Sequence, residues 1–189
     1  MGILSALFGR TKLKVADRDA FFSIVTAAFD LRGRNDLRIL HKAGLVMNPA
    51  ESAYFDNLDA ELRQLLAVSG RATGTRFEII DDDFGTRWVV LDGPDFEDLV
   101  STIHLISETV ADHGFADRIL AAAFAFEYQR QDAYWIYNYK SGKFYPFVAS
   151  GERERDNATE LRLGEVMKEQ KLPVERRLES WYALWGIPF

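Results

Sequence analysis

Residues 119–148 read ILAAAFAFEYQRQDAYWIYNYKSGKFYPFV, and this stretch decides the expected fold. It contains three runs of apolar and aromatic residues, at 119–128, 133–140 and 143–148, which is the composition of β-strands. Short polar turns separate the runs, and residues 141–142 form a turn that is tight enough for a hairpin. Because such short intervals leave no room for helical crossovers, the strands are expected to pair antiparallel.

Two further strands are expected upstream, at 77–80 and 87–91. The segment between them, residues 81–85 (DDDFG), is predicted to be a tight turn. Residues 37–47 also contain strand-forming residues, but residues 42–44 (KAG) interrupt them. The chain is therefore expected to fold back on itself at that interruption.

Helices are predicted between these strands from the spacing of apolar residues and from end signals. The first covers residues 17–31. The second starts with an N-cap at Asn48 and ends at Gly70, and the third runs from Pro94 to Gly114. Each has one apolar face, so the helices are expected to cover the sheet.

Two more helices are predicted in the last part of the chain. Asn157 with Glu160 forms a capping pattern that starts a fourth helix. A final short helix is expected around residues 175–185, where Trp181 and Trp185 would share one face. These two tryptophans either cap the core of the domain or form a secondary interface with a partner.

The composition is that of one globular domain. The chain has 189 residues, 48% of them hydrophobic, and no linker-like stretch divides it. We therefore expect a single α+β domain over residues 1–189, with a mainly antiparallel sheet and helices packed on it. The absence of cysteine excludes disulfides, thiolate metal sites and cysteine nucleophiles. The net charge of −6 argues against a nucleic-acid-binding protein.

Residues 1–14 form a short segment that is first apolar and then basic. Because its charges follow the apolar run, it lacks the order of a secretory signal and is predicted to be retained in a cytoplasmic protein. As a helix of about two turns, it would present one apolar ridge. That ridge would pack on its own domain, dip into the inner face of the cell membrane, or fill a groove of a partner. The candidate contact residues are Ile3, Leu4, Leu7, Phe8, Arg10, Lys12 and Lys14.

No catalytic, metal-binding or cofactor-binding motif is recognised in the sequence. Residues 83–85 (DFG) match the magnesium-binding tripeptide of protein kinases, but the other kinase motifs are missing, so a turn is predicted. Residues 81–83 lack the ligand spacing of a calcium loop. His41, His104 and His113 lack the spacing of zinc ligands. We therefore predict no enzyme activity, no cofactor and no metal site.

Five short motifs occur in order from the first residue of the chain to the last. They are residues 1–12 (MGILSALFGRTK), residues 82–85 (DDFG) with Trp88, residues 144–147 (FYPF), residues 155–158 (RDNA) with Glu160 and Leu161, and Trp181 with Trp185, Gly186 and Pro188. In these motifs the chain resembles PspAB, the PspA-associated protein family of bacteria and archaea. The resemblance implies a link to PspA, the membrane-binding, ESCRT-III-like protein of the phage-shock envelope-stress response. It implies no established catalytic activity and supplies no active-site residues.

The leading hypothesis is a non-catalytic accessory or regulatory protein of the PspA system that acts by protein–protein contact. One alternative is a peptide- or small-ligand-binding module with a groove beside its sheet, in the manner of secretion-chaperone-like α+β folds. The other is an undescribed enzyme, for which the acidic turn at residues 81–83 and His104 are the only candidate catalytic groups. A deep pocket with convergent polar groups would favour an alternative, and a shallow apolar patch would favour the leading hypothesis.

Overall fold

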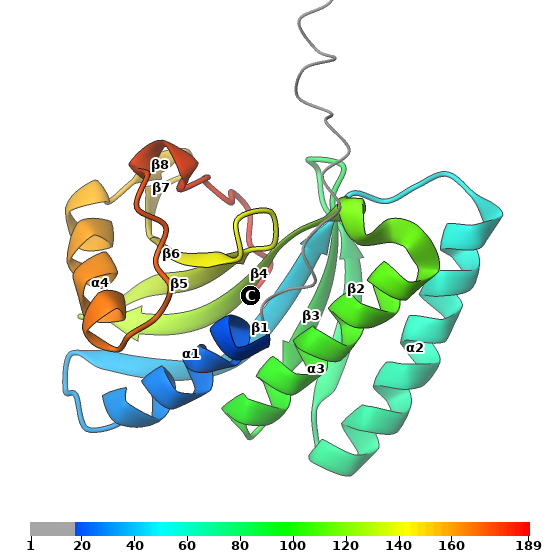
Figure 1. Cartoon of the computed structure of the whole chain (residues 1–189), viewed down its shortest axis with the longest axis horizontal. Helices are drawn as coiled ribbons and strands as arrows, with labels where there is room; N and C mark the ends of the chain where they lie inside the picture. Colours follow the sequence, from blue (N-terminus) through cyan, green and yellow to red (C-terminus); the bar gives the residue numbers. More distant parts are fainter. Residues whose placement is uncertain (1–17) are drawn as a thin grey trace, which may run out of the picture.

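The computed structural model describes residues 18–189, which form one α+β domain on a six-stranded antiparallel sheet (Figure 1). The strands lie in the order β2-β3-β1-β4-β5-β6. This confirms the predicted fold class and the three closely spaced strands. The strands are β1 (Leu37–Met47), β2 (Arg76–Asp81), β3 (Arg87–Asp92), β4 (Ile119–Tyr128), β5 (Gln131–Asn138) and β6 (Lys143–Phe147), and a separate hairpin pairs β7 (Ala149–Gly151) with β8 (Glu154–Arg155).

Three helices cover one face of the sheet, and a fourth lies beside β6 (Figure 1). The three are α1 (Arg18–Leu31), α2 (Ala53–Thr73) and α3 (Phe96–Val110), and the fourth is α4 (Asn157–Glu169). A π-helical turn at Ala111–Phe115 and a 3₁₀ turn at Ala116–Arg118 lead from α3 into β4. The predicted fold-back within residues 37–47 is wrong, because β1 is one continuous strand paired with both β3 and β4. The pairing of β1 with β4 has a bulge between Ile39 and Ala43, next to the KAG sequence at residues 42–44, and the strand continues through it.

The caps of two helices differ from the predicted ones. α2 begins after Ser52, whose Oγ accepts a hydrogen bond from the Phe55 amide at 3.2 Å, and not after Asn48. The Asn48 amide instead donates to the Arg118 carbonyl at 2.9 Å, so it belongs to the connection to the sheet. α2 also continues past Gly70 to Gly74, which adopts φ 72° at the C-cap. α4 is capped by Asp156, which accepts from the Thr159 amide at 2.9 Å, one residue before the predicted cap.

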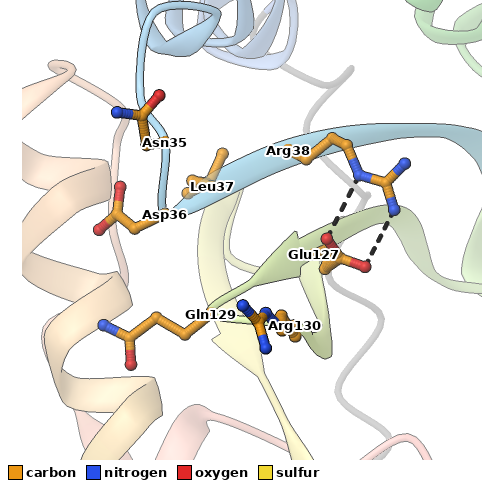
Figure 2. Close-up of a pocket in the computed structure, with 7 residues that line it drawn as sticks. All are labelled: Asn35, Asp36, Leu37, Arg38, Glu127, Gln129 and Arg130. Carbon is orange, nitrogen blue, oxygen red and sulfur yellow. Dashed lines mark hydrogen bonds and ion pairs between the residues drawn. The ribbon is translucent and has the colours of Figure 1, made fainter.

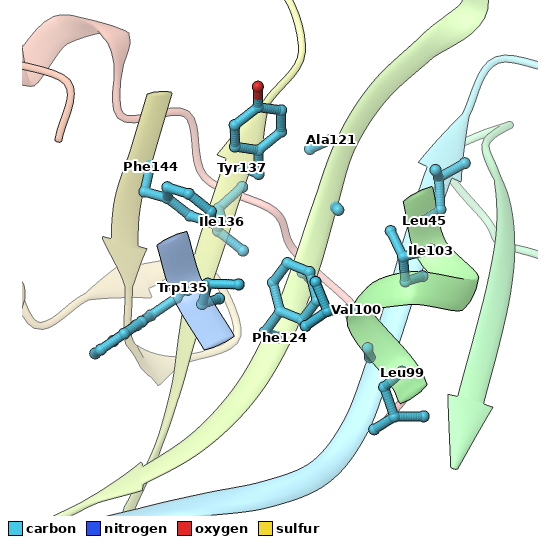
Figure 3. Packing of buried hydrophobic residues seen from close by; sticks show 14 of the residues in the cluster. Leu45, Leu99, Val100, Ile103, Ala121, Phe124, Trp135, Ile136, Tyr137 and Phe144 are labelled. Carbon is cyan, nitrogen blue, oxygen red and sulfur yellow. The ribbon is translucent and has the colours of Figure 1, made fainter. Parts of the chain in front are cut away.

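The main core lies between the sheet and the helices. Because side chains alternate along a strand, β4 directs Phe124 and Phe126 toward α3, where both rings lie 5.8 Å from the ring of Phe96. Phe124 is fully buried and also contacts Phe21 of α1 at 6.0 Å between ring centroids. Figure 3 shows Phe124 beside Val100 of α3 in the middle of this packing. Ala121, Ala123 and Ala125 alternate with these residues and face the opposite side of the sheet.

Candidate partner-binding surface

The tip of the β2–β3 hairpin presents an exposed aromatic ring on a tightly bonded turn. Phe84 is 55% exposed, while the Asp82 carboxylate beneath it accepts hydrogen bonds from several donors. These donors are the amides of Phe84 and Thr86, at 2.9 and 2.8 Å, and the indole Nε1 of the buried Trp88, at 3.0 Å. Gly85 adopts φ 78°, a conformation that favours glycine and closes the turn. The backbone around Phe84 is therefore held in place before any partner arrives.

The base of this hairpin is joined to α2 by charged groups. Arg87 donates to both carboxylate oxygens of Asp81, at 2.6 and 2.8 Å, and to Asp59 of α2 at 3.3 Å. The same guanidinium lies over the ring of Phe55, 5.7 Å from its centroid. Arg87 is partly buried, so this arrangement fixes the orientation of the hairpin on the helix layer.

The aspartates of the hairpin are stabilised in their charged form. The hydrogen bond from Arg87 lowers the pKa of Asp81. Burial by itself raises the pKa of Asp82, but the hydrogen bonds from Thr86, Trp88 and Phe84 outweigh burial and leave that pKa below its usual value. Both carboxylates therefore favour folding above the ordinary aspartate pKa, and this contribution is lost as the pH falls through their folded-state values.

Residues 186–189 lie across the sheet face opposite α1–α3, next to the hairpin tip. The ring of Phe189 lies 6.0 Å from both Trp88 and Tyr134, and the Tyr134 hydroxyl donates to the Phe189 carbonyl at 2.8 Å. Gly44 of β1 makes room for this ring, because a Cβ there would lie 2.6 Å from the Phe189 ring and would displace it. A Cβ on Gly186 would lie 3.1 Å from the Phe84 ring, so this segment supports the tip from one side.

The predicted helix around residues 175–185 is wrong. Only Leu178–Ser180 form a 3₁₀ turn there, so Trp181 and Trp185 do not share a helical face. Trp181 is 7% exposed, and its indole occupies the space beside Gly164 of α4 and donates to the Glu175 carbonyl at 3.0 Å. These contacts of Trp181 stabilise a non-helical backbone, although Trp181 and Trp185 have the spacing of a helix. Trp185 is partly buried and packs against Phe147 at 5.4 Å, so the packing favours core capping over the secondary interface for both tryptophans.

Four of the five motifs that suggested a family resemblance lie in residues 18–189, and the motif at residues 1–12 lies outside the described residues. Asp82 and Trp88 bond to each other in the hairpin, and Arg155 pairs with Glu160 at 2.9 Å beside α4. The model of one protein family, described as PspAB, PspA associated protein B, matches residues 1–189. The chain belongs to the PspAB family. Comparison with curated proteins and with solved structures gave no match.

The PspAB chain also has a polar hollow of about 320 Å³ where β1 and β4 meet the β4–β5 turn (Figure 2). Its charged groups are largely engaged with one another. Arg38 donates to both carboxylate oxygens of Glu127, at 3.3 and 2.9 Å, and Asp36 is held by Arg34 at 2.8 Å. Six of its seven lining residues are polar or charged, and Leu37 is the apolar one, so it differs from the mostly apolar pocket that is typical of small-ligand sites.

The histidines and acidic residues that the sequence suggested as chemical groups lie apart in residues 18–189. Within residues 18–189, no group of three or more metal-ligating side chains is placed to hold an ion. His104 is buried between Phe21 and Phe22 of α1, with Nε2 3.3 Å from Glu108, and burial lowers its pKa. No helix in the described part of the chain is long and apolar enough to cross a bilayer.

The residues predicted to contact a partner or membrane lie outside the described part of the chain. These are Ile3, Leu4, Leu7, Phe8, Arg10, Lys12 and Lys14. The sequence pattern places Phe84 in a turn and does not identify it as a contact residue. The signal for it is a large apolar residue inside an otherwise acidic turn, residues 81–85, where nothing in the local pattern would bury it.

Proposed function

We propose that this PspAB protein is a non-catalytic accessory or regulatory component of the PspA system that acts by direct contact with PspA or another component of that system. The observation that carries the proposal is the match of the family model to the whole chain, because the family is described as PspA-associated. In this proposal the protein works in the cytoplasm as part of the phage-shock envelope-stress response.

The β2–β3 hairpin tip is the contact surface that the described residues support best. Aromatic side chains often dominate the binding energy of protein interfaces, and a contact that is fixed in advance loses less entropy on binding. Phe84 meets both conditions, since it is exposed and its backbone is bonded to Asp82. The Asp83 carboxylate, which is exposed next to Phe84, suits a partner whose surface has an apolar pocket with a basic group at its rim.

The proposal is tested by recovering the protein from its native host with its partners and identifying them by mass spectrometry. PspA or another component of its system is expected in the recovered material, both from intact membranes and after detergent treatment. If neither preparation contains any component of the PspA system, the proposed function is wrong.

The Phe84→Ala variant is expected to bind PspA at least about tenfold more weakly, because truncating an aromatic hot spot costs about 2 kcal/mol or more and a tenfold loss corresponds to about 1.4 kcal/mol. Isothermal titration calorimetry with purified PspA measures the loss. The matched control is Phe29→Ala, which removes a ring that is 66% exposed on α1 and has the Arg32 guanidinium over it. Equal affinities of the two variants would exclude the hairpin tip as the contact.

The double variant Leu4→Asp, Phe8→Asp is expected to reduce association with anionic liposomes or with PspA while the domain stays folded. The reason is the apolar ridge predicted at residues 3–8, next to basic residues that each add on the order of 1 kcal/mol of attraction to an anionic membrane. Co-sedimentation with and without PspA measures it, and added salt should weaken the wild-type signal. Equal co-sedimentation of the variant and the wild type contradicts this prediction. If the variant unfolds globally, the apolar ridge is instead part of the core of the domain.

A further inference from the structure

The ring of Phe189 occupies a shallow seat on the sheet face opposite α1–α3. Gly44 of β1 forms the floor of the seat, because a Cβ there would lie 2.6 Å from the ring. The side chains of Trp88 and Tyr134 form two walls, and each ring meets Phe189 edge-on, at interplanar angles of 78° and 80°. Aromatic pairs in this arrangement attract each other, so the seat suits a planar ring.

Residues 186–189, which we call the strap, are joined to the sheet by few polar contacts. They belong to neither a helix nor a strand. Within the described part of the chain, the strap makes one hydrogen bond, from the Tyr134 hydroxyl to the Phe189 carbonyl at 2.8 Å. Burial raises the pKa of Tyr134 to about 12, so its hydroxyl keeps the proton that it donates. The strap can therefore leave the seat without unpairing any strand.

The seated strap touches the hairpin tip in two places. Trp88, which packs against the Phe189 ring, donates from Nε1 to the Asp82 carboxylate at 3.0 Å, and that carboxylate holds the Phe84 amide at 2.9 Å. At the other end of the strap, a Cβ on Gly186 would lie 3.1 Å from the Phe84 ring. One segment of four residues thus contacts both the Phe84 ring and the tryptophan that anchors its turn.

We propose that residues 186–189 act as a regulatory strap: their seating on Gly44 holds Phe84 in its partner-binding orientation, and their release lowers the affinity for the partner. A contact that is fixed in advance loses less entropy on binding, so release weakens binding although Phe84 itself is unchanged. Phe189 is a positioning residue that acts through Trp88 and through the strap at Gly186. This inference rests on the proposed function, because it concerns the contact that is assigned there to Phe84.

The coupling is tested first in the full chain without a partner. Phe189→Ala empties the seat, and Gly44→Ala displaces the ring from the side of the sheet. In both variants, hydrogen exchange by NMR is expected to be at least about fivefold faster at the amides of Phe84 and Thr86, which is the lower end of ordinary coupling between sites. Gly33→Ala is the matched control, since a Cβ there meets nothing within 4 Å.

A double variant separates release of the strap from damage to β1. If Gly44→Ala acts by displacing the Phe189 ring, adding it to Phe189→Ala should change exchange at the tip little further. Fully additive effects would contradict the inference, because Gly44→Ala would then act through the strand and not through the strap. Phe189→Leu keeps part of the apolar contact and is expected to restore part of the protection.

Titration with purified PspA by calorimetry measures the regulation. Phe189→Ala and Gly44→Ala are each expected to bind at least about fivefold more weakly than the wild type, and Gly33→Ala should bind like the wild type. Adding Phe189→Ala to Phe84→Ala should cost little more than Phe84→Ala alone, because the strap acts through that ring.

Two results would overturn the inference. They are unchanged exchange at the hairpin tip in a folded Phe189→Ala protein, and wild-type affinity of that protein for PspA. If Phe189→Ala does not fold, Phe189→Leu and Gly44→Ala provide the same comparison. If PspA does not bind the wild-type chain, the proposed function fails, and the exchange measurements still decide whether the strap holds the tip.

Discussion

Replacing Phe124 by alanine is expected to lower the free energy of unfolding by about 3–5 kcal/mol, the range for truncating a buried phenylalanine. The ring is fully buried at the centre of the sheet and packs between Phe21 of α1 and Phe96 of α3. Its removal leaves a cavity where α1, α3 and β4 meet. Because the free energy of unfolding of a domain is usually only about 5–15 kcal/mol, this one substitution removes a large part of the stability.

Urea denaturation followed by tryptophan fluorescence measures the Phe124 effect. The control is Phe29→Ala, whose exposed ring should contribute about 0.5 kcal/mol or less. If the two variants had the same midpoint and slope, the core would not be organised around β4 as described.

Replacing Glu160 by alanine is expected to cost about 3–5 kcal/mol, because it leaves a partly buried arginine without its counter-charge. Glu160 is 2% exposed and accepts from the Val148 amide at 2.9 Å and from Arg155 at 2.9 Å. Arg155 in turn donates to the Trp181 carbonyl and lies 5.5 Å from the centroid of the Phe147 ring. The change therefore loosens α4, the end of β6 and the segment that holds Trp181 together.

Thermal and urea denaturation measure the Glu160 effect, with Glu165→Ala as the matched control. Glu165 lies on the same helix and pairs with Lys168 at 2.7 Å, but both side chains are exposed, so its loss should cost about 0.5 kcal/mol or less. Glu160→Gln should fall between the two, because its amide oxygen still accepts from Val148. Similar costs for Glu160→Ala and Glu165→Ala would mean that the buried pair does not hold the C-terminal part in place.

Much of the fold follows from local sequence patterns. Residues 119–148 predict three antiparallel strands correctly, because their apolar runs are separated by turns too short for a helix. The β2–β3 hairpin is also predicted correctly, since an acidic, glycine-containing turn separates two apolar runs. In these segments the interactions that fix the structure lie between residues close in sequence.

The errors occur where distant residues decide the structure. Residues 42–44 look like an interruption, but Ala43 and Gly44 are paired on both sides, with β3 and with β4, and the strand continues. Trp181 and Trp185 have helical spacing, but Trp181 packs beside Gly164 of α4 and Trp185 packs against Phe147 of β6. These contacts hold the segment in a non-helical conformation. Neither outcome can be read from a local window, because tertiary packing outweighs local preference.

The candidate site was predictable only in part. The sequence identifies residues 81–85 as an acidic turn, but the exposure of Phe84 depends on how the neighbouring segment at Gly186 packs, which local spacing does not reveal. The seat of Phe189 depends on strand pairing, which brings Gly44 of β1 next to Trp88 of β3 although the two residues are far apart in sequence. The contact residues predicted at positions 3–14 lie outside the described residues and stay predictions.

The central claim is direct contact between this PspAB protein and PspA, and titration of one purified protein into the other by calorimetry tests it most directly. We expect saturable binding with a dissociation constant of about micromolar or tighter, retained by Phe29→Ala and weakened by Phe84→Ala. Absence of binding between the two folded proteins, at concentrations well above micromolar and with anionic membranes both present and absent, would contradict the claim.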